Sequence, residues 1–399
     1  MVIALNITKR VQNLEYAIRD VVAHAKVLEE KGKDVIYLNI GDPLLFDFET
    51  PKNVKEAMIK AIKEDFNGYS PSEGLPELRE AICEKEKKVS DINILPENVI
   101  ISNGVSEGIQ MVLGAIVDNG SEILVPGPTY PPYISYTGFF GGEAVQYRTC
   151  EENGWQPDLD DVRSKVNDST RAIVIINPNN PCGALYNRKI VKAMVDLAGE
   201  YNIPVISDEI YDQIAYDELV HTAKAAKDVT VIGLNGFSKV YLMTGWRLGY
   251  VYFTGHDEET LNEMREHITK EARIRLSANT PVQKAAVEAL RGPQDYIADM
   301  VEKLRKRRDY SDKRLNEING ISCAKPKGAF YFFPKVDGIV SRWKNDMAFV
   351  SDLLEQTGIV FVHGSGFGSA YGLGHFRGVF LPPIDTLEKT FDRLERFMA

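Results

Sequence analysis

Residues 235–250 have the sequence NGFSKVYLMTGWRLGY and follow the apolar run Val231–Leu234. This places Lys239 just beyond a predicted buried strand, where an ammonium group is costly unless it has a chemical role or a charge partner. A lysine that forms a Schiff base with an aldehyde cofactor has such a role. The hydroxyl of Ser238 and the guanidinium of Arg247 suit a phosphate group. The alternative is a lysine whose side chain extends to water beside a glycine turn.

Three other apolar runs end in polar residues. Residues 205–206 lead into SDEIY (207–211), residues 173–176 into NPNNPCG (177–183), and residues 99–101 into SNGVSE (102–107), which opens a helix. Taken singly, these segments fit an N-cap, a turn and a loop. However, Val/Ile-rich runs that alternate with helices are typical of a mostly parallel sheet covered on both faces. Sites in such sheets lie at the carboxyl ends of the strands, so we expect the four ends to converge.

The order of elements predicts two lobes. The expected strands of the large lobe are 99–101, 123–125, 172–176, 205–206, 229–234 and 248–253, after helices at 54–65 and 75–88. Other expected elements are a helix over 11–31, a strand over 35–40, a long helix over 297–318, a strand at 330–333, a helix at 347–356, strands at 359–362 and 376–381, and a final helix. We therefore predict an α/β domain of residues 45–290 and a smaller α+β domain of residues 1–44 and 291–399.

The composition argues against several classes of protein. The hydrophobic content of 44% and charged content of 26% fit a soluble globular chain, and the net charge of −10 argues against nucleic acid or an anionic membrane as partner. No run approaches a membrane span, and the apolar start at residues 1–5 is too short for a signal sequence. The four cysteines form no C-x-x-C pair, and the six histidines show no metal spacing. We expect a cytoplasmic protein with reduced thiols and no metal site.

The chain resembles the class I/II aminotransferases, which are pyridoxal-phosphate enzymes of fold type I. The matching elements, in the family's order, are NIGDP (39–43), YSPSEG (69–74), PNNPCG (178–183), SDEIY (207–211), the lysine segment 235–250 and Arg377. Within the family the chain looks closest to archaeal alanine aminotransferases, through LEYAIRD (14–20), VHGSGFG (362–368) and HFR (375–377).

The resemblance implies that the cofactor is pyridoxal 5′-phosphate and gives roles to particular residues. Lys239 would carry the cofactor as a Schiff base and then move the proton between Cα and the cofactor. Asp208 would pair with the ring nitrogen and keep it protonated. Tyr211 and Asn180 would bond the phenolic oxygen, and Tyr130 would stack on the ring.

The same resemblance implies where the phosphate lies. It would sit on the start of a helix, at Gly104, Val105 and Ser106. Free N–H groups and the helix dipole favour an anion there, and Ser238 and Arg247 would complete the cup. Tyr69 would reach the phosphate of the neighbouring subunit, so the resemblance implies a homodimer with shared active sites.

The implied reaction moves an amino group between an L-amino acid and a 2-oxo acid by a ping-pong mechanism. The groups expected to bind the substrate's α-carboxylate are Arg377, Asn180 and the backbone at Gly41. Ser106 is neutral where some aspartate-specific relatives carry a lysine, and Tyr16 would press on a short side chain, which favours alanine as donor. The alternative is that Ser106 only caps the helix and carries no information about the substrate. The acceptor 2-oxoglutarate would then be tolerated by a rearrangement of the site or by an arginine near its distal carboxylate, for which Arg19 is one candidate.

Two positions depart from the family pattern. Cys182 stands where many relatives have threonine, and Gly236 stands where many have serine, so one phosphate hydrogen bond is expected to be absent or to come from elsewhere. Alternative functions that use the same lysine and aspartate are an aspartate or broad-specificity aminotransferase, a C–S lyase, and a synthase acting at the β or γ carbon. A transcription regulator would need an added basic domain, for which the match leaves no room. A nucleotide-binding protein is disfavoured because no G-x-G-x-x-G or Walker A motif occurs.

Overall fold

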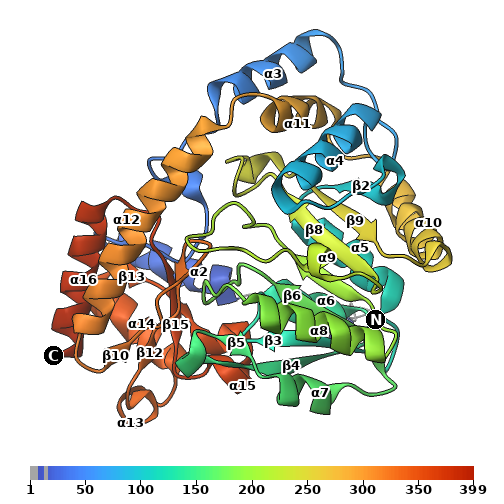
Figure 1. The fold of residues 1–399 in the computed structure, drawn as a ribbon. Helices are drawn as coiled ribbons and strands as arrows, with labels where there is room; N and C mark the ends of the chain where they lie inside the picture. The colour runs from blue at the N-terminus through green and yellow to red at the C-terminus, as the bar shows by residue number, and fades with distance from the viewer. Residues whose placement is uncertain (1–7, 13–16) are drawn as a thin grey trace, which may run out of the picture.

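An eight-stranded sheet forms the centre of the fold in this computed structural model, which describes residues 8–12 and 17–399 (Figure 1). The strands in spatial order are β2 (Val99–Ser102), β9 (Gly249–Thr254), β8 (Val231–Gly236), β7 (Val205–Asp208), β6 (Thr170–Ile176), β3 (Glu122–Gly127), β4 (Glu143–Cys150) and β5 (Gln156–Pro157). The five strands from β8 to β4 are parallel, whereas β9 runs antiparallel to both β8 and β2. The predicted mostly parallel sheet is confirmed, and β2, β6, β7 and β8 end on the same side of it.

Helices cover both faces of this sheet because successive strand residues point to opposite sides. Val174 and Ile206 pack with α5 (Val105–Ile116), α6 (Pro131–Phe139) and α10 (Glu258–Ile274). Ile173 and Val205 pack on the other side, with α4 (Pro76–Ser90), α7 (Leu159–Lys165) and α8 (Arg188–Glu200). The remaining helices of this part are α9 (Thr222–Ala225), which contacts β8, and α3 (Lys52–Lys63) and α11 (Thr280–Arg291), which pack on each other. Both faces of the strands are therefore apolar, as the near-continuous Val/Ile runs predicted.

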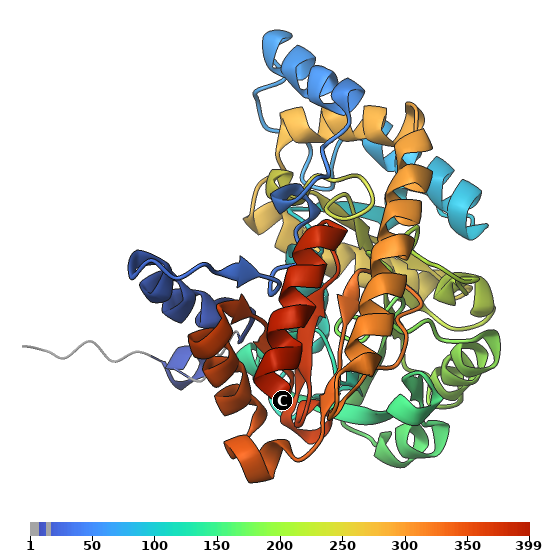
Figure 2. The same cartoon turned by 90° about the vertical axis from the view of Figure 1, so that its left-hand side faces the viewer.

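Small sheets and long helices make up the rest of the fold. The pairs are β1 (Ile36–Tyr37) with β13 (Ile359–Val360), and β10 (Ile321–Ser322) with β12 (Lys335–Val336). A three-stranded sheet has the order β11 (Tyr331–Phe332), β15 (Phe376–Val379), β14 (Val362–His363). The helices are α2 (Ala17–Glu30), α12 (Asp295–Glu317), α13 (Ile339–Trp343), α14 (Asp346–Thr357), α15 (Ser369–Gly372) and α16 (Ile384–Met398). Figures 1 and 2 both show α12 running beside α16.

One expected strand, over 359–362, is divided between two sheets in the structure. Instead of one strand over 359–362, β13 pairs with β1 and β14 pairs with β15, so the chain passes from one sheet to another at residue 361. Of the helix expected over 11–31, the structure describes the parts in α1 (Lys9–Gln12) and α2 as helical, and residues 13–16 lie outside the described chain. Apolar periodicity alone does not predict which partner a short strand pairs with. In the described ranges we find no helix whose length and apolar character would let it cross a membrane.

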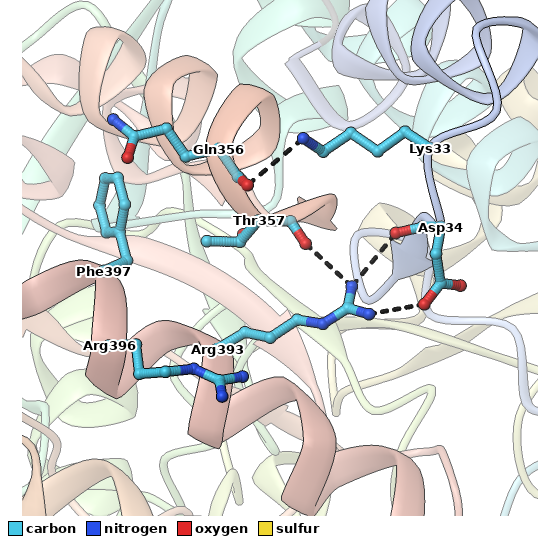
Figure 3. A pocket seen from close by; sticks show the side chains of 7 residues that line it. All are labelled: Lys33, Asp34, Gln356, Thr357, Arg393, Arg396 and Phe397. Atoms are coloured by element: carbon cyan, nitrogen blue, oxygen red, sulfur yellow. Dashed lines mark hydrogen bonds and ion pairs between the residues drawn. The ribbon is translucent and has the colours of Figure 1, made fainter.

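Arg393 joins the C-terminal helix α16 to the segment before β1 and to the end of α14 (Figure 3). Its guanidinium donates hydrogen bonds to the carboxylate of Asp34 (2.5 Å), to the backbone oxygen of Asp34 (3.1 Å) and to that of Thr357 (2.9 Å). Lys33 donates to the backbone oxygens of Glu355 (2.5 Å) and Gln356 (3.3 Å), near the end of α14. These cations satisfy carbonyl groups that the end of a helix leaves unpaired. The pocket that Lys33 and Arg393 line is therefore a place where the chain segments are held together by structural hydrogen bonds.

Candidate active site

A cavity of about 450 Å³ lies where β2, β6, β7 and β8 end. The residues expected to form a site that line it are Gly41, Val105, Ser106, Tyr130, Asn180, Asp208, Tyr211, Ser238, Lys239, Arg247 and Arg377. The structure thus brings together residues from distant parts of the sequence, from Gly41 near its start to Arg377 near its end. The expected convergence of the four strand ends is confirmed.

Lys239 follows β8 and reaches across to the segment after β1. Its Nζ donates a hydrogen bond of 2.6 Å to the backbone oxygen of Gly41. Burial lowers the pKa of Lys239, Asp42 opposes this shift, and the cations Arg377 and Arg247 add to it, so that the resulting pKa is about 8. The amine is therefore much more readily deprotonated than an ordinary lysine, as a nucleophile or a proton acceptor must be.

Asp208 ends β7 and is almost completely buried. One carboxylate oxygen accepts from the backbone N–H of Ile210 (3.3 Å) and the other from the hydroxyl of Tyr133 (3.0 Å). Burial raises the pKa of Asp208 to about 6, although both hydrogen bonds oppose this shift. A cationic group bound beside Asp208 would therefore stabilise its ionised form. Tyr133, on α6, was not predicted as part of the site.

The N-terminus of α5 lies beside Ser238 and Arg247 in the cavity wall. Its N-cap is Gly104, at φ +84°, and no side chain caps the first turn. A Cβ at Gly104 would overlap the guanidinium of Arg247, so only glycine allows that cation to approach the backbone here. Hydroxyl, guanidinium and free N–H donors beside a helix N-terminus are the groups that bind a phosphate.

Arg377 is a further cation in the lining of the cavity. It is 1% exposed, and its guanidinium lies 4.6 Å from the ring centre of Tyr331 and 4.8 Å from that of Phe367. It donates to the side-chain oxygen of Asn180 (3.0 Å) and to the backbone oxygen of Asn39. A buried guanidinium held by two rings is preorganised to bind a carboxylate.

A buried ionic cluster lies behind the two segments that carry Asp208 and Lys239. Lys85 pairs with Glu86 (2.8 Å) and with Asp212, and it bonds the hydroxyl of Tyr250 (3.3 Å). The same oxygen of Asp212 accepts from Asn235 at 2.9 Å. Because one buried lysine holds residues next to both segments, the cluster fixes their relative position. Breaking a buried pair of this kind leaves an uncompensated charge and is strongly destabilising.

Other predicted residues lie outside this cavity. Gly104 adjoins it without being part of its wall. Tyr69 is 83% exposed, which is consistent with the expectation that it serves a neighbouring subunit. Tyr16 lies outside the described residues, and the side chain of Arg19 is outside the described part as well.

The structure adds lining residues that the sequence analysis missed. These are Ile18, Ile40, Asp42, Ile176, Ile210, Thr244, Gly245 and Tyr331. Asp42 accepts from the backbone N–H of Leu44 (3.1 Å) and from the hydroxyl of Thr244 (2.9 Å), which connects the NIGDP motif to the lysine segment. That motif was a signal for Asp42. Tyr331 lies in the aromatic run 330–333, which on its own predicts only a buried strand.

The two departures from the family pattern have clear surroundings. Gly236 pairs with Gly249 across the sheet, and a Cβ at position 236 would lie 3.0 Å from the backbone of Leu248 and Gly249. Position 236 offers no side-chain donor, so the loss of one phosphate hydrogen bond stays a prediction. Cys182 is buried, and its thiol donates to the side chain of Asn179 at 3.1 Å.

The model of the aminotransferase class I and II family matches residues 33–393, so the chain belongs to this family. It is 37% identical over 398 residues to the glutamate-pyruvate aminotransferase AlaA of Escherichia coli K12, covering 98% of this chain and 97% of that protein. It is 39% identical over 397 residues to the alanine aminotransferase of Mycobacterium tuberculosis H37Rv, covering 98% and 92%. The solved alanine aminotransferase from Pyrococcus furiosus has a TM-score of 0.96 and 56% identity, covering 98% of this chain and 99% of that one.

The protein is thus a pyridoxal-phosphate-dependent aminotransferase with the fold of its family. The residues present fit that cofactor. The uncapped start of α5 with Ser238 and Arg247 suits its phosphate, and the readily deprotonated Lys239 suits its aldehyde. Within residues 8–12 and 17–399, no three or more His, Cys, Asp or Glu side chains gather in a group that could hold a metal ion.

Proposed function

We propose that the protein moves an amino group between L-alanine and 2-oxoglutarate by a ping-pong mechanism in this cavity. When bound, pyridoxal phosphate supplies an aldehyde that condenses with amines and a ring that delocalises the electrons of the broken Cα–H bond. Lys239 would hold the aldehyde carbon and then carry the proton to and from Cα. Asp208 would keep the ring nitrogen protonated, since its carboxylate is the buried anion at the end of β7.

The other lining residues would orient the two ligands. Arg377 and Asn180 would bind the α-carboxylate of the substrate, with the backbone at Gly41 beside them. Tyr211 and Asn180 would bond the phenolic oxygen, and Tyr130 would stack on the ring. The phosphate would lie on the anion cup at Gly104, Val105, Ser106, Ser238 and Arg247.

The observation that favours alanine is that the described cavity lining has no cation left for a second carboxylate. Among the described lining residues, the cations are Lys239, Arg247 and Arg377, and each already has a role in the proposal. The apolar side chains of Ile18 and Ile40 stand on the wall instead of a further cation. An unpaired distal carboxylate is costly to desolvate, so a short apolar side chain fits better. For 2-oxoglutarate, Arg19 remains our candidate partner of the distal carboxylate.

Alanine should be preferred to aspartate as the amino donor. With 2-oxoglutarate as acceptor, we expect kcat/KM for L-alanine to exceed that for L-aspartate, because the aspartate side chain would leave its charge unpaired. The measurement is initial rates with both donors at one acceptor concentration. Aspartate favoured by tenfold or more, about 1.4 kcal/mol of transition-state binding, would reject alanine specificity in favour of an aspartate aminotransferase.

We also propose a homodimer whose sites are shared. Tyr69 is 83% exposed, Ile274 84% and Leu276 55%, and Arg275 ties the two segments together by donating to the backbone oxygen of Ser72 (3.0 Å). Large exposed apolar side chains gathered on one surface favour contact with another protein surface. Tyr69 would then face the anion cup of the second subunit.

Mixing two variants that each have little activity should restore activity if the sites are shared. Lys239→Ala and Tyr69→Ala, each weak alone, should form hybrids in which one site carries neither change. After random exchange of subunits, half the dimers are hybrids and one of their two sites is intact, so about a quarter of wild-type activity should return. Each variant taken separately through the same exchange is the control. A fully active monomer in sedimentation would rule out the shared site.

We further propose the predicted division into a cofactor-binding domain of residues 45–290 and a small domain of residues 1–44 and 291–399. It is supported by the main sheet, whose strands all come from residues 99–254, and by the pairing of β1 with β13. A cytoplasmic location is also proposed, since the four cysteines are free thiols, which that compartment keeps reduced.

A further inference from the structure

We propose that Tyr331 is a positioning residue that turns the hydroxyl of Tyr211 into a hydrogen-bond donor toward the cavity and links it to Arg377. This inference rests on the proposed function, because it concerns how residues of the chain meet bound pyridoxal phosphate.

Tyr331 contacts three residues of the proposed site. Its hydroxyl oxygen lies 2.7 Å from that of Tyr211, and both side chains are buried, at 2% and 3% exposed. Its ring faces the guanidinium of Arg377 at 4.6 Å. A Cβ at Gly41 would overlap the Tyr331 hydroxyl, so the glycine leaves the room that this hydroxyl occupies. Tyr331 thus connects the proposed carboxylate-binding and ring-binding groups.

The direction of the hydrogen bond decides what Tyr211 can do. Only one hydrogen lies between the two oxygens, so the other hydroxyl hydrogen points elsewhere. The guanidinium of Arg377 against the ring withdraws electron density and makes the Tyr331 hydroxyl the stronger donor. When Tyr331 donates, the hydrogen of Tyr211 is left to point into the cavity that Tyr211 lines.

This geometry has a consequence for proton affinity in the loaded enzyme. A hydrogen bond donated by Tyr211 to the phenolic oxygen stabilises the anionic form of that oxygen. A strong donor therefore lowers the pH at which the bound group titrates, and a weaker donor leaves the midpoint higher. Removing the hydroxyl of Tyr331 allows Tyr211 to turn away or to lose its alignment. The midpoint should then rise.

The test is a pH titration of the visible absorbance of purified, cofactor-loaded wild-type and Tyr331→Phe proteins. Phenylalanine keeps the ring that faces Arg377 and removes only the hydroxyl. We expect the midpoint to rise by roughly half a unit to one unit, a three- to tenfold change in proton affinity. In a Tyr211→Phe background, adding Tyr331→Phe should cause no further shift, because Tyr331 acts through Tyr211.

Tyr147→Phe is the matched control. Tyr147 is another fully buried tyrosine, and its hydroxyl donates to the backbone oxygen of Val174 at 2.8 Å, outside the cavity wall. It should lose comparable stability in thermal unfolding and leave the midpoint unchanged. A midpoint that stays or falls in Tyr331→Phe, or shifts equally in the Tyr211→Phe background, would overturn the role of Tyr331. A wild-type protein without any titrating visible band would instead overturn the proposed site.

Discussion

Replacing Lys239 by alanine should lower kcat for transamination by several orders of magnitude while leaving the protein folded. The amine is the nucleophile that would hold the cofactor and the base that would move the Cα proton, so two functions disappear with one side chain. The fold should persist because the amine of Lys239 makes one hydrogen bond to the protein, to the backbone of Gly41. The measurement is the steady-state rate with L-alanine and 2-oxoglutarate, together with thermal unfolding of both proteins.

The attachment itself can be measured independently of the rate. Borohydride treatment of the wild-type enzyme should fix pyridoxal phosphate covalently on the peptide that contains Lys239, and the variant should retain none. The control is Lys165→Ala, because Lys165 is also partly buried but pairs with Asp161 away from the cavity. It should keep both the attachment and the activity. A Lys239→Ala protein that turned over at the wild-type rate would contradict the assignment.

The lowered pKa of Lys239 should make the rate of cofactor attachment depend on pH. Burial lowers this pKa to about 8, and only the deprotonated amine attacks an aldehyde. Recombination of cofactor-free protein with pyridoxal phosphate should therefore accelerate as the pH rises toward about 8 and level off above it. An ordinary lysine would keep accelerating to about pH 10.

Replacing Asp208 by asparagine should slow Cα proton removal on the order of 10³-fold or more, because the charge that keeps the ring nitrogen protonated is lost. Asparagine has nearly the same shape and still accepts a hydrogen bond from Tyr133 or from the backbone of Ile210. The measurement is the single-turnover rate with L-alanine. Asp346→Asn is the matched control, since Asp346 is also buried but bonds Ser365 outside the cavity. Near-normal single-turnover rates in Asp208→Asn would refute the role.

The same substitution should stabilise the cofactor-free protein at neutral pH. The pKa of Asp208 is raised by burial from 3.8 to about 6, so the folded state holds this proton more tightly than the unfolded state. Wild-type stability from this group therefore falls as the pH rises from 3.8 to about 6. Above that window the penalty is about 3 kcal/mol, and asparagine removes it. Below pH 3.8 this contribution to the difference should vanish.

Most of the site was predictable because a polar residue directly after an apolar run marks the end of a buried strand. The apolar runs before Asp208 and Lys239 are buried in the parallel sheet, so their ends meet at one place. By contrast, β4 was not predicted, because most of its residues are only partly buried or exposed and they include the polar Glu143, Gln146 and Arg148. Its place in the sheet comes from pairing with β3.

The supporting residues of the site were harder to predict. Tyr133 lies on a helix, and its contact with Asp208 depends on how α6 packs against β7. Tyr331 reaches Tyr211 only because β11 is placed beside the cavity and because Gly41 leaves room. Such contacts depend on tertiary approach between distant segments, and hydrophobic periodicity in the sequence does not report it.

The reaction of the purified enzyme with L-alanine alone, without any 2-oxo acid, tests the account most directly. The proposal predicts one equivalent of pyruvate per active site, no ammonia, and a cofactor recovered in its aminated form. Adding 2-oxoglutarate should then return the original visible band and release one equivalent of glutamate. Continued formation of pyruvate and ammonia from alanine alone, with no aminated cofactor, would contradict a transaminase acting through Lys239.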